Sequence, residues 1–309
     1  MLKRLKNTDM DIFPIVLGTD YYGSAVSEET AFSNLDAYVE NGGNIVDTAR
    51  MYADGKSEET IGKYIKERKL KNKLLISTKA AYPFDGDVQK HRLTLGEIEG
   101  DVDKSLSALG TERIDILWLH RDLPSVPAWQ ISDDLAQIVK KGKVRFWGVS
   151  NWRSERIKEL NKYAAENGNP PIVSSQIQWS LAKPSCVYDP TLVTMGKTEY
   201  KFYSEEKMPV FAFASQAKGF FEKYASGVSG GKAMERYLNE DNVKMYEKLV
   251  KISRESGFSL TALSLAYLTG REDFQTFPII GCSKTEYVGK ALEALKVPDE
   301  VRREIYESL

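Results

Sequence analysis

The sequence is poor in the residues that build metal centres and disulfide frameworks. Its 309 residues include two cysteines and two histidines. Neither Cys186 nor Cys282 stands in a spacing typical of a metal site, and with only His91 and His120 available a multi-histidine metal centre is not expected. We expect both cysteines to act as small hydrophobic residues in a reducing compartment.

The sequence also lacks long hydrophobic runs and an excess of either charge. Lys and Arg number 43, Asp and Glu 44, and the formal net charge is −1. The absence of a basic block argues against nucleic acid or an anionic membrane as the main partner. No run approaches the length of a membrane span, and no apolar segment of a signal peptide follows the basic N-terminal residues. We therefore expect an unprocessed cytoplasmic protein.

Short apolar runs alternate with amphipathic segments along the whole chain. The first run, 15–18, precedes a helix that opens near Ser27 and closes at Asn41-Gly42-Gly43. Seven more runs, each followed by a plausible helix, are 45–47, 74–79, 114–120, 144–150, 172–178, 209–214 and 276–281. The helices expected after the second to fifth runs cover 57–68, 95–109, 133–141 and 155–166. Apolar runs of this kind are typical of parallel strands buried on both faces.

Eight strand-then-helix units predict an α/β fold of the (α/β)8 TIM barrel type, with residues 1–309 in a single domain. A doubly wound open sheet is the competing architecture, but the turn after the first strand, GTDYYG, lacks its glycine-rich fingerprint. Segments 82–94, 181–208 and 216–241 exceed ordinary loop length. We expect them at the C-terminal face, either as binding or gating loops or as plain surface insertions.

Four polar residues stand at or just after the ends of these runs. Asp47 ends the second run and Tyr52 follows it, Lys79 ends the third, and His120 ends the fourth. Because the C-terminal ends of barrel strands carry catalysis, we expect these four side chains in one site. Taken singly, each has a structural alternative, such as a helix cap for Asp47 or a hydrogen-bonded strand-end histidine for His120.

Together, these four groups are suited to moving a proton on or off a carbonyl or alcohol oxygen. An isolated phenol titrates near pH 10, and a nearby lysine ammonium lowers that pKa. An aspartate would hold the lysine, and the histidine would supply a second hydrogen bond to the oxygen. No nucleophile with an adjacent base is apparent, so the hydride would come from a bound organic cofactor.

The motifs that carry these residues resemble those of the aldo-keto reductases. The chain has Asp47 and Tyr52 in DTARMY, Lys79 in STK, His120 in LH, and then GVSNW at 148–152. The resemblance runs in order over nearly the whole chain. It implies a barrel preceded by a short N-terminal β-hairpin, into which 2–5 and 12–16 fit. It also implies Tyr52 as general acid, Lys79 and Asp47 as the pair that lowers its pKa, and His120 as the residue that orients the carbonyl.

The resemblance further implies a nicotinamide dinucleotide cofactor. The positions it assigns to cofactor binding are Gly18, Thr19, Asp47, Ser150, Asn151, Gln176, Phe213, Ala214, Gly219, Gly281, Ser283, Lys284 and Tyr287. Phe213 stands where the family usually has a stacking tyrosine, and Tyr287 where many relatives have an arginine for the 2′-phosphate. Because Lys284 could meet that phosphate, we expect NADPH, with NADH as the alternative.

The strand-end loops offer aromatic groups and one cation to a small carbonyl or alcohol substrate. The predicted lining residues are Tyr21, Tyr22, Tyr82, Arg121, Trp152 and Trp179. Arg121 has two interpretations: a salt bridge with Asp122 that shapes the mouth, or recognition of a carboxylate or hydroxyl-rich substrate.

Three functions compete at this stage. The first is an NAD(P)H-dependent reductase that turns an aldehyde or ketone into an alcohol, and the four filled catalytic positions favour it. The second is a nucleotide-binding redox sensor with little turnover. The third is a phosphate-metabolite isomerase or lyase on the same barrel, which would have no affinity for nicotinamide.

Overall fold

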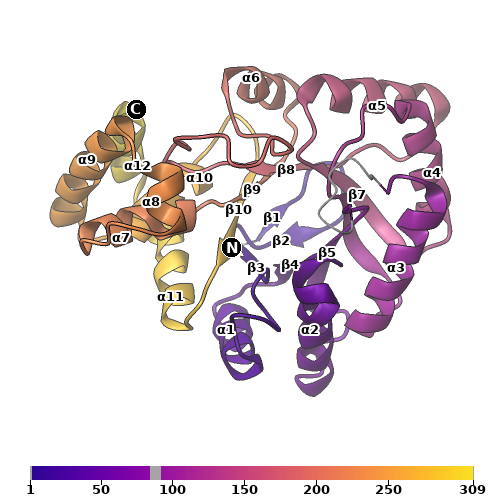
Figure 1. Ribbon diagram of the computed structural model, residues 1–309, viewed down its shortest axis with the longest axis horizontal. Coiled ribbons are helices and arrows are strands. Elements are labelled where there is room, and N and C mark those ends of the chain that lie inside the picture. The colour runs from indigo at the N-terminus through magenta and orange to yellow at the C-terminus, as the bar shows by residue number, and fades with distance from the viewer. Residues whose placement is uncertain (1, 84–91, 309) are drawn as a thin grey trace.

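Eight parallel strands close into a barrel in the computed structural model of the chain, which describes residues 2–83 and 92–308 (Figure 1). The strands are β3 (Val16–Gly18), β4 (Ile45–Asp47), β5 (Leu75–Ala80), β6 (Ile114–Leu119), β7 (Val144–Ser150), β8 (Ser175–Gln178), β9 (Val210–Phe213) and β10 (Thr276–Gly281). Each pairs with its neighbour in sequence, and β10 also pairs with β3, which closes the ring. The predicted (α/β)8 barrel is confirmed.

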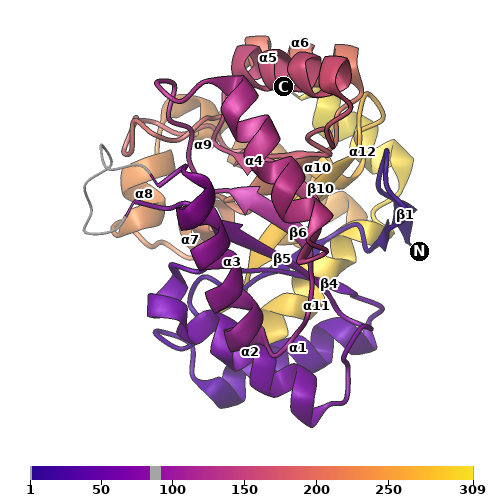
Figure 2. The same ribbon diagram turned by 90° about the vertical axis from the view of Figure 1, so that its right-hand side faces the viewer.

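Helices surround this barrel, and Figure 2 shows β4, β5 and β6 lying inside them. The helices that follow the strands up to β8 are α1 (Glu28–Glu40), α2 (Lys56–Glu67), α3 (Leu95–Leu109), α4 (Ala128–Lys140), α5 (Ser154–Asn167) and α6 (Lys197–Glu206). Those after β9 are α7 (Phe220–Ala225), α8 (Lys232–Tyr237), α9 (Glu240–Ser256) and α10 (Leu260–Thr269), and those after β10 are α11 (Glu286–Leu292) and α12 (Asp299–Glu307). No helix in the described part of the chain is both long and apolar enough to cross a membrane.

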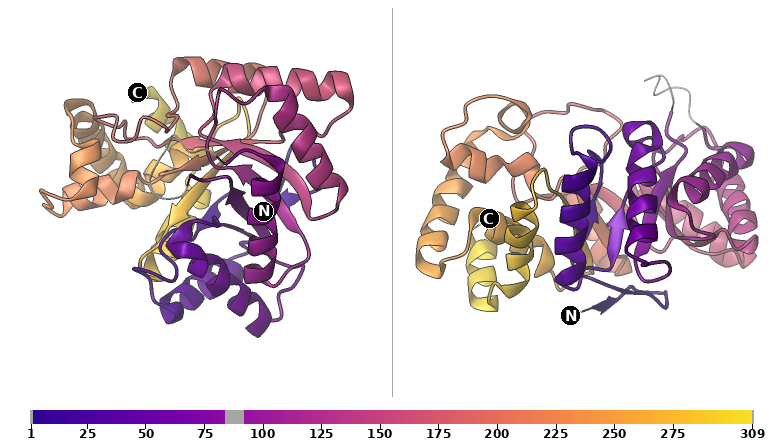
Figure 3. Two further views of the ribbon diagram at one scale, coloured as in Figure 1. Left: turned by 45° about the vertical axis from the view of Figure 1, so that its right-hand side comes forward. Right: turned by 90° about the horizontal axis from the view of Figure 1, so that it is seen from below.

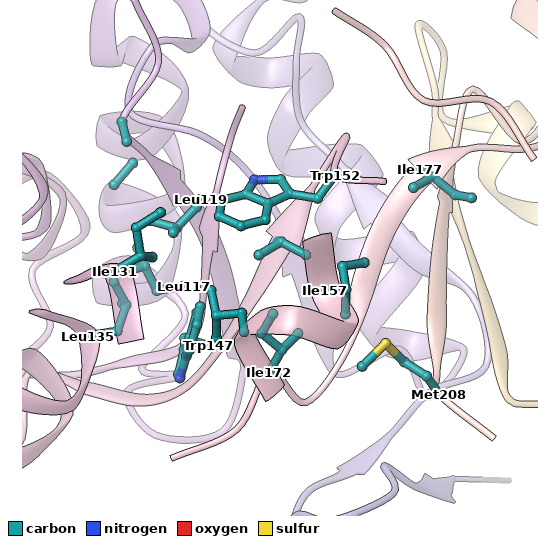
Figure 4. Close-up of a cluster of buried hydrophobic side chains, with 14 of the residues drawn as sticks. Leu117, Leu119, Ile131, Leu135, Trp147, Trp152, Ile157, Ile172, Ile177 and Met208 are labelled. Atoms are coloured by element: carbon teal, nitrogen blue, oxygen red, sulfur yellow. The ribbon is translucent and has the colours of Figure 1, made fainter. Parts of the chain in front are cut away.

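The side chains of each strand alternate between the barrel interior and the helices outside. On β6, Ile116 and Trp118 join the interior cluster, whereas Leu117 and Leu119 pack outward. Figure 4 shows this outer layer, in which Leu117 and Leu119 lie near Ile131 of α4. Successive side chains of a strand point to opposite faces, and here both faces are buried among apolar residues. The strands therefore are continuous apolar runs in the sequence.

A short antiparallel hairpin precedes the barrel, as expected. It consists of β1 (Lys3–Arg4) and β2 (Asp11–Ile12) and lies at one end of the barrel in Figure 3. Its residues Leu5, Met10 and Ile12 are buried in the interior cluster and close that end. The second strand is shorter than the predicted 12–16, because Val16 already begins β3.

Two of the predicted long loops contain helices. Segment 181–208 includes α6, and 216–241 includes α7, α8 and the start of α9. Figure 1 shows α7, α8, α9 and α12 grouped on one side of the barrel, around α10. Helix α10 is apolar on nearly every face and lies buried there, which is the position that such a helix requires. Of segment 82–94, residues 84–91 lie outside the described part of the chain.

The predicted start of the fourth helix was wrong by five residues. We expected 133–141, whereas α4 spans Ala128–Lys140. Pro127 occupies its N-cap with φ −59°, the value that proline imposes and that a helix start accepts. The first turn also buries Ala128 and Ile131, which extends the apolar face toward the N-terminus. Other predicted limits, such as 95–109, 144–150 and 276–281, agree with α3, β7 and β10.

The contact between α2 and α3 generates a test of packing with two helical glycines. A Cβ at Gly62 of α2 would lie 2.3 Å from the Ala108 carbonyl oxygen, whereas a Cβ at Gly100 of α3 would meet no heavy atom of the described residues within 4 Å. We expect Gly62→Ala to lower the free energy of unfolding by about 1–3 kcal/mol. Gly100→Ala should raise it by about 0.5–1 kcal/mol. Urea unfolding of both variants measures the difference, and equal effects would contradict this account of the helix contact.

Candidate active site

The polar residues predicted for the site all lie at the C-terminal end of the barrel strands. Asp47 is the last residue of β4, Lys79 lies near the end of β5, and His120 directly follows β6. Tyr52 begins a 3-10 turn, η1 (Tyr52–Gly55), that leads into α2. Asp47 is in register with Ser77 on β5, so the next inward-facing residue of β5 is Lys79.

Asp47 and Lys79 form an ion pair that is almost wholly buried. Lys79 Nζ lies 2.5 Å from Asp47 Oδ2 and donates a second hydrogen bond of 2.9 Å to the Thr48 carbonyl oxygen. The other carboxylate oxygen, Oδ1, accepts from Ser77 Oγ at 2.8 Å and from Gln176 Nε2 at 2.9 Å. The side chains are 3% and 1% exposed. Buried charges need partners of this kind, and Asp47 is therefore not a helix cap.

Tyr52, His120 and Tyr82 gather around the ammonium group of Lys79. The Nζ atom lies 4.8 Å from the centre of the Tyr52 ring. The Tyr52 and His120 rings are 6.2 Å apart, edge to face, and the Tyr82 ring is 4.8 Å from that of His120. The structure thus brings together Asp47, Tyr52, Lys79 and His120, which are far apart in the sequence.

The electrostatics of Tyr52 and Lys79 are dominated by burial. Burial raises the pKa of the Tyr52 phenol, and Lys79 opposes the rise as expected from the sequence, but the net pKa lies above its ordinary value. Burial favours the neutral amine of Lys79, but Asp47 and Tyr52 together outweigh it and hold the pKa of Lys79 above its usual range. At neutral pH the site therefore holds a protonated phenol beside an ammonium ion.

His120 is a neutral imidazole in this environment. Burial lowers its pKa well below the ordinary value, and the positive charges of Lys79 and Arg121 lower it further. Its Nδ1 atom is buried and has no hydrogen-bond partner among the described residues. A neutral imidazole carries one N–H, so it can donate to a carbonyl oxygen without adding charge to the site.

Ser150 and Asn151, at and just after the end of β7, do not cap α5. Asn151 has a left-handed φ of 61°, its Oδ1 accepts from the Val193 backbone N–H, and its Nδ2 donates to Ser150 Oγ. The first N–H of α5, that of Ser154, is instead capped by Glu199 of α6. Ser150 Oγ accepts the bond from Asn151 and keeps its own O–H to donate.

Two predicted cofactor residues already have partners inside the protein. Gln176 reaches across the barrel to Asp47. The hydroxyl of Thr19 is buried, bonding to the Asp47 carbonyl oxygen and Ser57 Oγ. Gly18 packs tightly against β10, where a Cβ would lie 2.8 Å from Ile279 Cγ2. These three residues therefore shape the barrel mouth.

The remaining predicted cofactor residues follow β9 and β10. Phe213 and Ala214 are half-buried at the end of β9, and Gly219, with a left-handed φ of 76°, starts α7. After β10, Gly281, Ser283 and Lys284 are exposed. The ring of Tyr287 lies between two cations, with Lys284 Nζ 5.9 Å and Lys290 Nζ 5.8 Å from its centre.

Three of the aromatic residues predicted to contact substrate are buried elsewhere. Tyr22 is 1% exposed beneath α1, and Trp152 is 0% exposed in the core shown in Figure 4, beside Leu119. Trp179 points outward from β8 and packs on Tyr200, Tyr267 and Phe274. It lines a cavity of about 430 Å³ between that strand and α6 that does not include the four clustered residues. The structure therefore does not bring Tyr22, Trp152 and Trp179 together with the four clustered residues.

Arg121 is a structural residue, but its predicted partner was wrong. Its Nη2 atom lies 3.6 Å from Asp189, its Nε donates to Thr191 Oγ1, and its Nη1 donates to the His120 carbonyl oxygen. Asp122 pairs instead with Arg156. Arg121 therefore anchors the segment between β8 and α6 to the end of β6. It also lies 5.4 Å from the Tyr82 ring.

With this geometry established, the chain can be compared with known proteins. The model of the Aldo/keto reductase family matches residues 14–308. The chain belongs to the aldo/keto reductase family. Membership makes it an oxidoreductase.

Several curated relatives are similar over most of their length. "Probable aryl-alcohol dehydrogenase AAD4" of Saccharomyces cerevisiae is 29% identical, covering 88% of this chain and 85% of the relative. "Norsolorinic acid reductase B" of Dothistroma septosporum is 27% identical, with 93% and 75% covered. "Aryl-alcohol dehydrogenase [NADP(+)]" of Phanerodontia chrysosporium is 26% identical, with 93% and 80% covered.

Two residues of this aldo/keto reductase site were missed in the sequence. Ser77 bonds to Asp47, and its spacing of two from Lys79 on one strand was the signal that could have identified it. Asp20 follows Thr19, and its carboxylate lies 3.6 Å from the position of a Cβ on Gly281. Crowding by protein raises the pKa of Asp20, although its side chain reaches solvent, and Lys218 and Lys79 oppose this rise. No sequence pattern distinguished it from a loop carboxylate.

The lowered pKa of His120 predicts how stability depends on pH. Folding holds His120 neutral, so its contribution is complete above the unfolded pKa of about 6.5 and is lost as pH falls below that value. Below that pH the unfolded chain binds a proton at His120 that the folded chain does not bind. We expect His120→Asn to lose less stability than the parent protein between pH 7 and pH 5 in urea unfolding. Parallel pH dependence of the two proteins would contradict the burial of a neutral imidazole.

Proposed function

We propose that this chain is an NADPH-dependent reductase that converts a small aldehyde or ketone into an alcohol, with Tyr52 as general acid. The observation that carries the proposal is the convergence of Tyr52, Lys79, Asp47 and His120 at the mouth of the barrel. Family membership supports the same reaction class.

Tyr52 would give its proton to the substrate oxygen as the carbonyl carbon is reduced. Its raised pKa keeps the phenol protonated at neutral pH. An alkoxide is a stronger base than a phenolate, so transfer from phenol to the developing alkoxide is downhill. Lys79, fixed by Asp47 and Thr48, would stabilise the phenolate that Tyr52 leaves behind.

His120 would orient the carbonyl oxygen toward Tyr52. A neutral imidazole edge to face with the phenol can donate one hydrogen bond to an oxygen held between the two rings. A positive charge at this position would compete with Lys79, and burial avoids it. Two donors directed at one oxygen polarise the carbonyl before the proton moves.

Groups at the ends of β7, β9 and β10 fit a nicotinamide dinucleotide. When bound, such a cofactor supplies the hydride. Ser150 has a hydroxyl proton to donate to the carboxamide, and Phe213 offers a partly exposed ring for stacking. At the far end, Ser283 and Lys284 are exposed, and the Lys284 ammonium suits a 2′-phosphate. This cation is the reason to prefer NADPH to NADH.

We further propose an aromatic aldehyde as the substrate class. Two curated relatives are named aryl-alcohol dehydrogenases, one of them with NADP(+). The rings of Tyr82 and His120 lie 4.8 Å apart at the mouth, and Tyr21 is 43% exposed beside it, so planar apolar surface is available there. Nothing in the site favours the redox sensor or the isomerase and lyase alternatives.

The first test is turnover with a panel of aromatic aldehydes, followed by loss of the absorbance of NADPH. We expect reduction by the parent protein and a fall in kcat of about 10²–10⁴-fold in Tyr52→Phe, because a general acid contributes that much. NADPH affinity, measured by calorimetry, should be unchanged. Full activity of Tyr52→Phe would remove Tyr52 from the reaction. NADPH binding without turnover would indicate the sensor, and absence of binding the isomerase or lyase.

The second test concerns the cofactor and uses the two lysines that flank Tyr287. We expect Lys284→Met to raise the Kd for NADPH roughly 10- to 100-fold, the value of a charge-assisted hydrogen bond, and to leave the Kd for NADH nearly unchanged. Lys290→Met, which removes the other cation near the same ring, is the matched control and should change neither. Calorimetric titration with both cofactors measures the four constants. Equal losses for NADPH and NADH, or equal effects of both variants, would contradict the assignment of Lys284.

A further inference from the structure

A second buried ion pair lies behind the candidate catalytic residues, outside the barrel. Glu58, in the first turn of α2, is 0% exposed, and its Oε2 accepts from Arg50 Nη1 at 2.5 Å. Its other oxygen, Oε1, accepts from Thr78 Oγ1 at 2.6 Å. Arg50 precedes Tyr52 by two residues, and Thr78 directly precedes Lys79. One carboxylate therefore joins the segment that carries the phenol to the strand that carries the ammonium group.

The turn that holds Tyr52 has an unusual backbone. Ala53, Asp54 and Gly55 are three consecutive residues in the left-handed region, with φ of 49°, 54° and 92°. A residue other than glycine in that region costs roughly 1–3 kcal/mol and persists only where surrounding contacts hold it. Such a turn needs support, because a relaxed backbone would move the residue that begins it.

Arg50 supplies that support from beneath the turn. Its Nη2 atom donates to the Asp54 carbonyl oxygen at 3.3 Å, and a Cβ on Gly55 would lie only 1.2 Å from the same nitrogen. The guanidinium thus fills the space that a side chain at position 55 would take. The backbone N–H of Arg50 also donates to the Lys79 carbonyl oxygen at 3.1 Å, which fixes the start of the turn on β5.

The pair is too deeply buried to be an ordinary surface ion pair. The Arg50 side chain is 16% exposed and that of Glu58 is 0% exposed, so both have lost most of their hydration. Burial raises the pKa of Glu58, and Thr78, Ser105 and Arg50 oppose the rise. Compared with apolar residues of similar size, a buried ion pair contributes little net stability. The pair is therefore more important for fixing the positions of the segments that it joins.

We propose that Arg50 and Glu58 are positioning residues that hold the Tyr52 turn at a fixed distance and orientation from Lys79. This inference rests on the proposed function, in which Tyr52 gives its proton beside the Lys79 ammonium. In this proposal both side chains act from outside the site and neither contacts substrate or cofactor. The pair acts through the left-handed turn on one side and through Thr78 on the other.

The test compares Arg50→Met, Arg50→Lys and the double variant Arg50→Met/Glu58→Gln. We expect Arg50→Met to lower kcat for carbonyl reduction roughly 10- to 100-fold, the effect of a displacement of about 1 Å, with KM and NADPH affinity within about two-fold. Arg50→Lys keeps the charge but not the forked donor, so it should recover only part of kcat. The double variant leaves no unpaired charge, and its kcat should stay low because the turn still lacks its support.

Alcohol oxidation provides a readout that a loss of stability alone would not change. If Tyr52 moves away from Lys79, the pKa of the phenol rises, and the pH at which oxidation reaches its plateau rises with it. The matched control is Arg145→Met, which removes an arginine paired with Asp115 at the opposite end of the strands. Arg145→Met should lower Tm without changing kcat or the pH profile.

Several outcomes would overturn the inference. Normal kcat and an unchanged pH profile in the double variant would do so, as would an equal loss of kcat in Arg145→Met measured below the Tm of every variant. If the charged variants do not fold, Thr78→Val removes one hydrogen bond with nearly the same shape, and an unaltered kcat and pH profile there would also be decisive. Inactivity of Tyr52→Phe with full activity of Arg50→Met would refute this inference alone. Full activity of Tyr52→Phe would refute the proposed function itself.

Discussion

The ion pair between Lys79 and Asp47 is the constraint on which the catalytic end of this barrel depends. Removing two charges from water costs several kcal/mol per ion, so the pair is tolerable only because its remaining hydrogen bonds are made. Ser77 and Gln176 donate to the carboxylate, and the Thr48 carbonyl accepts from the ammonium. These partners come from two strands, β5 and β8, and from the residue after β4, so the barrel must close correctly before the pair can form. Once formed, it fixes a positive charge beside the phenol with no freedom to reorient, and that is how a preorganised site stabilises developing charge.

The strand β5 links this interior pair to the second one outside. Successive residues of a strand point to opposite faces, so Lys79 projects into the barrel while Thr78 projects toward α2 and Glu58. Two adjacent residues thereby connect two buried ion pairs, and the Tyr52 turn lies between them. The outer pair, Arg50 and Glu58, and the left-handed turn depend on each other. The Arg50 guanidinium occupies the space that only a glycine at position 55 leaves open. The glycine at position 55, the left-handed backbone and the buried ion pair are therefore consistent with one another. Isolated surface ion pairs have no such relation to the backbone around them.

The sequence predicted the features that depend on periodicity and on strand ends. Alternation of apolar runs predicted the eight strands, and the position of catalytic residues at the ends of barrel strands predicted that Asp47, Lys79 and His120 lie close together. Prediction from the sequence failed where a side chain could point in either of two directions or bind either of two partners. An aromatic residue after a strand can face the mouth or the helices, and Trp152 and Trp179 are buried in the layer outside the barrel. Arg121 pairs with Asp189, which lies 68 positions away, rather than with its neighbour. Contacts between residues so far apart leave no pattern in the local sequence. The hydrogen bond from Thr78 to Glu58 could not be predicted for the same reason.

Arg121 connects the segment between β8 and α6 to the residues at the barrel mouth. Its guanidinium binds the carbonyl of His120, the residue proposed to orient the substrate, and also Asp189 and Thr191 in the segment between β8 and α6. That segment further reaches Asn151 through the Val193 N–H. A change of sequence in the segment would therefore act on the positions of His120 and Asn151 through fixed hydrogen bonds, without replacing either residue. Asp47 and Lys79 lie on strands outside these contacts, so such a change can shift His120 and Asn151 and leave the buried ion pair in place.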